Sequence, residues 1–304
     1  MQFETISVVG LGYIGLPTAA LFASRGVKVV GIDVNPVAVE SINNGKIHIV
    51  EPGLEDVVSA AVEKGLLSAK LEAESADAFL IAVPTPIETS KKPDLNYIKA
   101  AAKSIAPVLK KGDLVILEST SPVGTTSLLE SWLIAERPDL TFPSNGGEVS
   151  IAYCPERVLP GKILQELVSN DRIIGGLNSS SSKLAVQLYK MVVEGECIET
   201  DAQTAEMTKL TENSFRDLNI AFANELSLIS DKFKIDVWEL ISLANRHPRV
   251  NILQPGPGVG GHCIAVDPWF IVSEAPEIAK LVKMARDVND GKPKWVVNKV
   301  RTFL

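Results

Sequence analysis

The chain has 304 residues, of which 46% are hydrophobic, and carries a formal net charge of −7. This length and composition fit two ordinary domains with a buried core each, and they exclude a disordered chain. The negative charge and the absence of a basic run exclude nucleic acid or an anionic membrane surface as the main partner.

The sequence also lacks the signals of export, membrane insertion and metal binding. No apolar run is long enough to cross a bilayer, and the first residues do not form a signal peptide, so we expect a cytoplasmic protein. The three cysteines, Cys154, Cys197 and Cys263, lack the spacing of a disulfide framework or a zinc site. We therefore expect no metal, and any cysteine that does chemistry acts as a thiol.

Short β-branched runs alternate with helical stretches through about the first 200 residues, which is typical of parallel βαβ units. We predict an α/β domain over residues 1–200, with a Rossmann-type, doubly wound parallel sheet. The serine tract Ser179–Ser182 is interpreted as a surface loop. The expected strands are Thr5–Val9, Lys28–Ile32, Ala78–Val83, Leu114–Glu118, Val149–Tyr153 and Arg172–Ile174.

A glycine motif connects the first expected strand to a helix. It reads Gly10-Leu11-Gly12-Tyr13-Ile14-Gly15, and the next strand ends at Asp33. In this context the glycines allow a tight turn, a close approach of the backbone to a pyrophosphate and close packing of helix on strand. Asp33 can accept hydrogen bonds from ribose hydroxyls and would repel a 2′-phosphate, which favours NAD over NADP.

Other candidate contacts to NAD follow later strands. Threonines lie after the third and fourth expected strands, at the sheet edge where ligands of open α/β folds bind, although each segment alone could be an ordinary turn. The residues predicted to bind NAD are Gly10, Gly12, Tyr13, Ile14, Gly15, Asp33, Thr85, Thr120 and Thr126.

The pattern becomes helical after residue 200. Residues 204–232 contain no glycine or proline, which predicts one long helix opening a mainly helical domain over residues 201–304. At about 100° per residue, a polar trio shares one face of this helix and an apolar row shares the opposite face. The trio is Lys209, Asn213 and Arg216, and the row is Leu218, Phe222, Leu226 and Ile229.

Further elements complete the second domain. We expect a helix over Val237–Asn245, a Pro/Gly-rich loop from His247 to Pro268, and a helix over Trp295–Leu304. Because the sequence stops inside this last helical pattern, it suggests a truncated chain.

The Pro/Gly-rich loop contains a cysteine with access to a ligand. It reads Gly256-Pro257-Gly258-Val259-Gly260-Gly261-His262-Cys263, and the glycines let backbone and ligand come close. For Cys263 alone, a buried apolar role is the commoner alternative, since free cysteine is among the most buried residue types.

Several motifs in order resemble the UDP-glucose/GDP-mannose dehydrogenase family, and the likeness covers nearly the whole chain. The segments are Gly10–Gly15, Cys154-Pro155-Glu156-Arg157, Glu206–Asn213 and Gly258–Asp267. Two of these segments resemble the UDP-N-acetylmannosamine branch of the family more than the UDP-glucose branch. They read Asn213-Ser214-Phe215-Arg216 and Gly260-Gly261-His262-Cys263.

The resemblance implies an NAD-dependent, four-electron oxidation of the C6 alcohol of a UDP-sugar to a uronate. It makes Cys263 the nucleophile that forms a thiohemiacetal and then a thioester, and it assigns oxyanion stabilisation to Lys209 and Asn213. Asp267 and Glu156 become candidates for proton handling, and the sequence does not choose between them.

The resemblance also implies contacts to the sugar nucleotide and a homodimer formed through the long helix. The apolar row of that helix fits a dimer seam, but it could equally close a core within one chain. The residues that the resemblance places at the sugar nucleotide are Arg157, Val158, Lys209, Asn213, Arg216, His247, Arg249 and Gly260.

Structural alternatives stay open for the charged residues. Lys209 and Glu206 could belong to a solvated helix face, Asp267 could cap a turn, and Glu156 could pair with Arg157. His247 precedes a proline and could be an ordinary turn residue.

The resemblance further implies a third, C-terminal domain, to which no segment here corresponds, so we expect NAD binding with weak or absent turnover. Two other functions remain: a single-hydride dehydrogenase of the β-hydroxyacid class, and a non-catalytic NAD-binding fragment.

Overall fold

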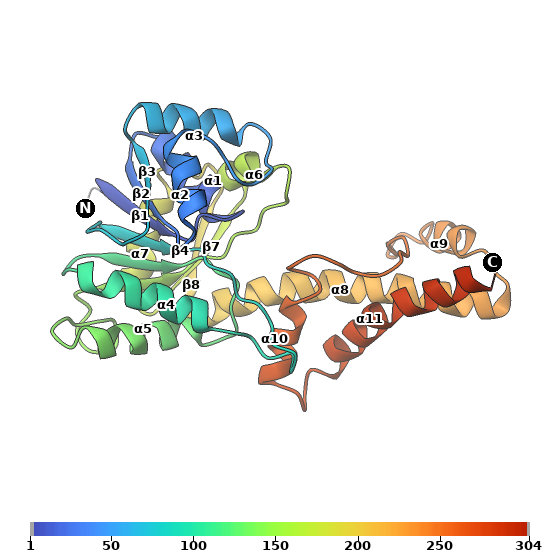
Figure 1. Cartoon of the computed structure of the whole chain (residues 1–304). Helices are drawn as coiled ribbons and strands as arrows, with labels where there is room; N and C mark the ends of the chain where they lie inside the picture. The colour runs from blue at the N-terminus through green and yellow to red at the C-terminus, as the bar shows by residue number, and fades with distance from the viewer. Residues whose placement is uncertain (1–2, 303–304) are drawn as a thin grey trace. The chain divides into compact units, whose positions relative to one another are not determined.

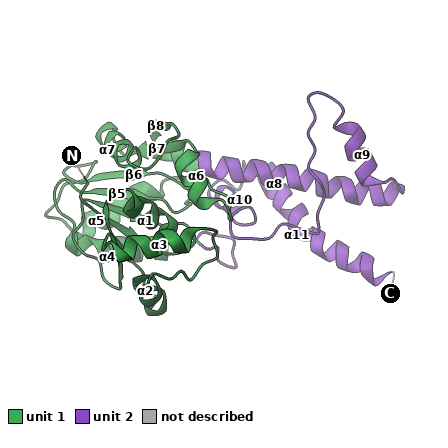
Figure 2. Cartoon of the chain, turned by 90° about the horizontal axis from the view of Figure 1, so that it is seen from above, with its two compact units in different colours: residues 1–85, 95–207 green, residues 86–94, 208–304 purple. Residues whose placement is uncertain are grey.

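The computed structural model describes residues 3–302 and divides the chain into two compact units. Unit 1 comprises residues 1–85 and 95–207, and unit 2 comprises residues 86–94 and 208–304 (Figure 2). The predicted domain limits, 1–200 and 201–304, stay a prediction.

Unit 1 is built on one eight-stranded sheet with the order β3-β2-β1-β4-β5-β6-β7-β8 (Figure 1). All neighbouring strands are parallel except β6 and β7, which pair antiparallel through Ala152–Gly176 and Tyr153–Gly175. The strands are β1 (Thr5–Val9), β2 (Lys28–Ile32), β3 (Leu67–Lys70), β4 (Ala78–Ile81), β5 (Leu114–Leu117), β6 (Ser150–Tyr153), β7 (Arg172–Gly176) and β8 (Cys197–Asp201).

Successive residues of the central strands alternate between two cores, one on each face of the sheet. In β4, for example, Ala78 and Leu80 join one core and Phe79 and Ile81 join the other. Helices α1 (Gly15–Ser24), α3 (Leu54–Glu63), α6 (Ile163–Ser169) and α7 (Ser179–Tyr189) pack on the first core, and α4 (Asn96–Ile105) and α5 (Thr125–Glu136) pack on the second. A short helix, α2 (Pro36–Asn43), follows β2, and a 3₁₀ turn, Ala106–Val108, follows α4.

This arrangement confirms the predicted doubly wound sheet, with corrections. The antiparallel β7 departs from an all-parallel sheet. The edge strands β3 and β8 were not predicted, because the alternating pattern of β3 is only four residues long and most of β8 is exposed. The predicted loop Ser179–Ser182 is wrong: these serines form the first turn of α7, where the Asn178 side chain accepts a hydrogen bond from the Ser181 amide.

Unit 2 is mainly helical. It contains most of α8 (Ala202–Phe233), together with α9 (Val237–Ala244), α10 (Asp267–Glu274) and α11 (Lys280–Arg301). The long α8 and the helix α9 match the predicted helices, whereas α10 was not predicted and α11 begins before the predicted Trp295. The last two residues of the predicted terminal helix, 303–304, lie outside the described residues. Among residues 3–302, no helix has the length and apolar character needed to span a bilayer.

Candidate functional site

The glycine turn after β1 fits the phosphates of a dinucleotide. Gly10 has a φ of +92°, and a Cβ there would lie 2.7 Å from the Ala82 carbonyl oxygen. A Cβ on Gly15 would lie 1.7 Å from the carbonyl oxygen of Gly10, so this close packing requires glycine. A Cβ on Gly12 would meet nothing within 4 Å, so the open space needed for a pyrophosphate lies beside that residue and the amino end of α1.

Asp33 lies beside this turn, at the end of β2. One carboxylate oxygen accepts a hydrogen bond of 2.9 Å from the Leu11 amide, and the other accepts one of 2.9 Å from the Asn35 amide. Each oxygen can accept a further bond, so the carboxylate suits a pair of ribose hydroxyls.

The threonines predicted to contact NAD differ in their surroundings. Within residues 3–302, the buried hydroxyl of Thr85 has no hydrogen-bond partner. Thr120 is half-buried after β5. The Thr126 hydroxyl donates to Glu206 at 2.6 Å, and the Thr126 amide donates to the same carboxylate at 2.8 Å.

Glu206 is therefore not part of a solvated helix face. Its side chain is fully buried and also accepts a 2.6 Å hydrogen bond from the Gly124 amide, so the carboxylate caps the amino end of α5. Burial is the largest influence on this group and raises its pKa. The sequence motif contains Glu206, but only the fold shows that it binds a segment about 80 residues earlier.

Unit 2 brings together the residues predicted to act with the cysteine. Asn213 on α8 is buried and donates from its amide nitrogen to Asp267 at 2.5 Å. Asp267 is the first residue of α10, and its amide donates to the Cys263 carbonyl at 2.9 Å. Cys263 is exposed, so the predicted nucleophile is accessible.

The charges of this cluster act on one another. Desolvation by the surrounding protein raises the pKa of the Cys263 thiol, the charge of Asp267 raises it further, and Lys209 lowers it. Burial raises the pKa of Asp267 to about 6, against opposing contributions from Asn213 and Lys209. Lys209 is half-buried, and across residues 3–302 its ammonium group makes no hydrogen bond or ion pair, so its three donors remain for a ligand.

The residues predicted to bind the sugar nucleotide belong to both units. Arg157 and Val158 lie in unit 1 after β6, where the Arg157 guanidinium donates to the Asp171 carbonyl at 3.2 Å. In unit 2, four further candidates are exposed, and His247 accepts a 3.3 Å hydrogen bond from the Arg249 amide. The exposed candidates are Arg216, His247, Arg249 and Gly260.

Glu156 is one of several buried ionisable groups in unit 1. It pairs with Arg172, and both side chains are 4% exposed. Nearby, Glu118 accepts a 2.6 Å hydrogen bond from the Tyr189 hydroxyl, and burial together with the charge of Glu156 raises the pKa of Glu118 to about 8. Burial likewise raises the pKa of Cys154. The sequence did not indicate this cluster, because its members come from four separate segments: the residues after β5, the residues after β6, β7 and α7.

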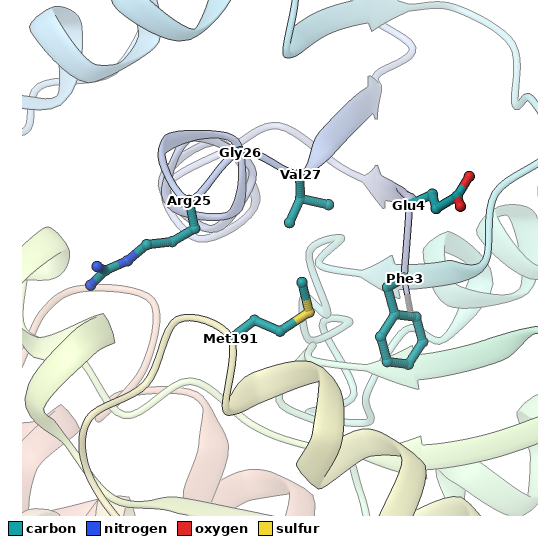
Figure 3. A pocket seen from close by; sticks show the side chains of 6 residues that line it. All are labelled: Phe3, Glu4, Arg25, Gly26, Val27 and Met191. Atoms are coloured by element: carbon teal, nitrogen blue, oxygen red, sulfur yellow. The ribbon is translucent and has the colours of Figure 1, made fainter. Parts of the chain in front are cut away.

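A separate hollow of about 330 Å³ opens at the amino ends of β1 and β2 (Figure 3). The glycine turn and Asp33 follow the carboxyl ends of the same strands, so the hollow lies at the edge of the sheet opposite the cofactor turn. It is lined by Phe3, Glu4, Arg25, Gly26, Val27 and Met191.

Comparisons with known proteins agree with this geometry. The fold and the glycine turn define an NAD-binding dehydrogenase. Residues 4–193 match the NAD binding domain of the UDP-glucose/GDP-mannose dehydrogenase family, and residues 203–291 match its central domain. The chain belongs to this family, and the predictions of NAD as cofactor and of a nucleotide-sugar dehydrogenase are confirmed.

Individual relatives are similar over nearly the whole chain. The chain is 67% identical to UDP-N-acetyl-D-mannosamine dehydrogenase of Yersinia pestis and covers 72% of that protein with 99% of its own length. It is 66% identical to NDP-N-acetyl-D-galactosaminuronic acid dehydrogenase of Ralstonia nicotianae, with the same coverage. Among solved structures, UDP-D-ManNAc dehydrogenase of Pyrococcus horikoshii has 43% identity and a TM-score of 0.91, with 97% of this chain and 70% of that chain covered.

Proposed function

We propose that this protein oxidises the C6 alcohol of a UDP-sugar to a carboxylate through a covalent intermediate on Cys263. The observation that carries the proposal is the cluster in unit 2, where the exposed Cys263 is under the electrostatic influence of Lys209 and of an Asp267 bound to Asn213.

The glycine turn and Asp33 would hold NAD, which supplies the hydride acceptor for each of the two oxidations. After the first oxidation, the Cys263 thiolate adds to the aldehyde carbon, a C–S bond forms, and the carbonyl oxygen becomes an oxyanion. The ammonium of Lys209 and the second N–H of the Asn213 amide stabilise this oxyanion, which takes a proton from solvent, equal to the one that the thiol released on ionising, to give the thiohemiacetal.

The second oxidation converts the thiohemiacetal to a thioester, which water then hydrolyses. Asp267 takes a proton from the water, the hydroxide adds to the thioester carbon, and the C–S bond breaks to release the Cys263 thiolate and the carboxylic acid, which loses its proton to solvent to give the carboxylate. A carboxylate with a pKa of about 6 is suited to this step near neutral pH. Glu156 is the less suitable base, since its charge is already paired with buried Arg172.

The sugar is proposed from the names of the relatives. UDP-N-acetyl-D-mannosamine is the first candidate, because a dehydrogenase for that sugar is 67% identical. A galactosamine derivative is the second, because an NDP-N-acetyl-D-galactosaminuronic acid dehydrogenase is 66% identical. Both names describe N-acetylated amino sugars, so we expect a preference for them over UDP-glucose, with contacts from Arg157, Val158 and Arg216 and from the loop residues His247, Arg249 and Gly260.

The proposed reaction is tested by stoichiometry. The protein is incubated with NAD and either UDP-N-acetylmannosamine or UDP-N-acetylgalactosamine, at high enzyme concentration and for long times so that weak turnover is registered, and NADH is counted per sugar consumed. Two NADH per uronate, lost in Cys263→Ser and retained in Cys197→Ser, are expected. One NADH, unaffected by Cys263→Ser, would move the protein to the single-hydride class. NAD binding without turnover of any UDP-sugar would favour the non-catalytic alternative.

We also propose that the apolar face of α8 forms a homodimer. Phe222 is 54% exposed and Ile229 is 43% exposed, while Leu218 and Leu226 are half-buried, so a continuous apolar row remains accessible. Light scattering of Phe222→Glu is expected to give a monomer, whereas Glu239→Lys, at an exposed position of α9 outside this row, is expected to leave the dimer intact. A monomeric parent would contradict this proposal.

A further inference from the structure

The buried face of α8 is polar rather than apolar. Asp217 and Asn224 are fully buried, and Asn213 is 8% exposed, so buried polar side chains recur along one stripe of the helix. Burying such groups is costly unless each is hydrogen-bonded. The hydrogen-bond partners of these side chains therefore show which segments the stripe holds in place.

The partners come from α11. The Arg286 guanidinium, fully buried, donates to Asp217 at 2.6 Å. Asn289, one turn further along, donates from its amide nitrogen to the same carboxylate at 2.7 Å and accepts from the amide nitrogen of Asn224 at 2.8 Å. We call these four residues, Asp217, Asn224, Arg286 and Asn289, the anchoring network.

The anchoring network also binds the backbone of the cysteine loop at both ends. At the start of the loop, the Gly256 amide donates to the Asn224 side-chain oxygen at 2.9 Å. At its end, Arg286 donates a long hydrogen bond, 3.4 Å, to the carbonyl of Ile264, the residue after Cys263.

A packing contact adds a third fixed point. A Cβ on Gly258 would lie 2.8 Å from the Pro293 side chain on α11, and Gly258 has a φ of +157°. The loop thus touches α11 where only glycine fits. The segment between Gly258 and Ile264 is solvent-accessible, since Gly260, Gly261 and Cys263 are exposed. Its two ends are held by the contacts described above.

We propose that Arg286 is a positioning residue for Cys263, which it holds in place by binding the carbonyl of the next residue, Ile264. Asp217 fixes Arg286, Asn289 links Asp217 to Asn224, and Asn224 holds the opposite end of the loop. The proposal rests on the proposed function only for the role of Cys263 in catalysis. The same stripe of α8 carries Asn213, whose amide binds Asp267, so one helix face arranges the loop and its proton acceptor together.

A role in stability alone does not explain why the anchoring network binds the backbone of the cysteine loop. A well-packed apolar cluster often stabilises a fold as much as a buried ion pair does, so stability alone gives no reason for a buried arginine. Here, two members of the network bind main-chain atoms of the cysteine loop. Preorganisation by such supporting bonds is what keeps a reactive side chain within a fraction of an ångström of its working position.

The test measures the reactivity of Cys263 in the absence of substrate. Arg286→Lys keeps the positive charge beside Asp217 but loses the guanidinium fork, and Asn224→Ala releases Gly256. Asp290→Asn is the matched control, because it removes the partner of Arg286 that is 43% exposed and leaves the loop contacts intact. Alkylation of Cys263 by iodoacetamide is followed by peptide mass spectrometry across the pH range.

In folded Arg286→Lys and Asn224→Ala, the pH midpoint of Cys263 alkylation is expected to fall toward that of an ordinary thiol. The rate near pH 8 is expected to rise by about threefold or more, because a released loop relieves the desolvation of the thiol and its repulsion by the charge of Asp267, the two effects that raise its pKa. Folding is checked by circular dichroism and by unchanged NAD affinity. A parent-like midpoint and rate in both folded variants would overturn the proposal.

Hydrogen exchange of the parent protein supplies a measurement that needs no variant. The Gly256 amide, bound to Asn224, is expected to exchange at least about tenfold more slowly than the amides of Gly260 and Gly261. Equal exchange rates would overturn the anchoring of the loop. Since neither readout requires turnover, failure here is distinguishable from failure of the NADH stoichiometry test.

Discussion

Replacing Gly12 and Gly15 singly by alanine separates cofactor binding from folding, because the added methyl group meets open space at one position and backbone at the other. At Gly15 the Cβ would lie 1.7 Å from the carbonyl oxygen of Gly10, so α1 must move away from β1. Overpacking of this kind costs about 1–3 kcal/mol and more when backbone is involved. At Gly12 the Cβ meets nothing within 4 Å, so the free energy of unfolding should change by less than about 0.5 kcal/mol.

NAD affinity is expected to change in Gly12→Ala without a change in stability. A methyl group in the space reserved for the pyrophosphate should cost about 1–3 kcal/mol, or roughly 5- to 150-fold in Kd. Urea denaturation gives the stability of each variant, and isothermal titration calorimetry gives its affinity for NAD. Parent-like NAD affinity in a folded Gly12→Ala protein would refute the assignment of the pyrophosphate to this turn.

Four further predictions concern the ionisable groups, two on Asp267 and one each on Glu206 and Cys263. Because Asp267, the base proposed for the hydrolysis, is ionised only above its pKa of about 6, turnover should rise with pH through this value, and Asp267→Asn should lack that limb of the pH–rate profile. The same raised pKa means that the folded state binds the proton of Asp267 more tightly than the unfolded state does. The stabilising contribution of Asp267 is therefore complete below its ordinary pKa and is lost as the pH rises through about 6. Denaturation midpoints of Asp267→Asn that follow those of the parent at every pH would contradict this. Glu206→Ala should lower the free energy of unfolding by about 3–5 kcal/mol in urea titrations, since it leaves three donors at the amino end of α5 without their acceptor, whereas exposed Glu225→Ala should change it little. Iodoacetamide should modify exposed Cys263 at least about tenfold faster than buried Cys154, whose pKa is raised by burial, and equal rates by peptide mass spectrometry would count against a reactive Cys263.

The fold of unit 1 was largely predictable because its central strands carry a strong local signal. β1, β2, β4 and β5 are short apolar runs buried on both faces, and the glycine motif fixes the turn after β1. The edge strand β8 gives no such signal, since most of Cys197–Asp201 is exposed. The direction of β7 depends on pairing between residues 20 or more positions apart, which local periodicity does not report.

The candidate site was predictable only in part. The sequence motifs singled out Lys209, Asn213, Cys263 and Asp267, and the structure adds the 2.5 Å bond between Asn213 and Asp267. Arg286 was not predicted, because a charged residue within a helix normally lies on the solvated face. Its burial depends on Asp217, 69 positions earlier in the chain, and such long-range pairs leave no local pattern.

Helix α8 shows why amphipathic patterns need tertiary context. The rule that apolar residues face the core would turn Phe222 and Ile229 inward, yet both are exposed, while Asp217 and Asn224 are buried. Partners on α11 bind Asp217 and Asn224 of the polar stripe, although Asp217 Oδ2 and Arg286 Nε make no hydrogen bond within residues 3–302, and the apolar row is left for another surface. Helix α8 therefore carries a buried polar stripe on one side and an exposed apolar row on another, and each side limits which residues can be substituted. Substitutions on the apolar row should alter association, and substitutions on the polar stripe should alter the cysteine loop.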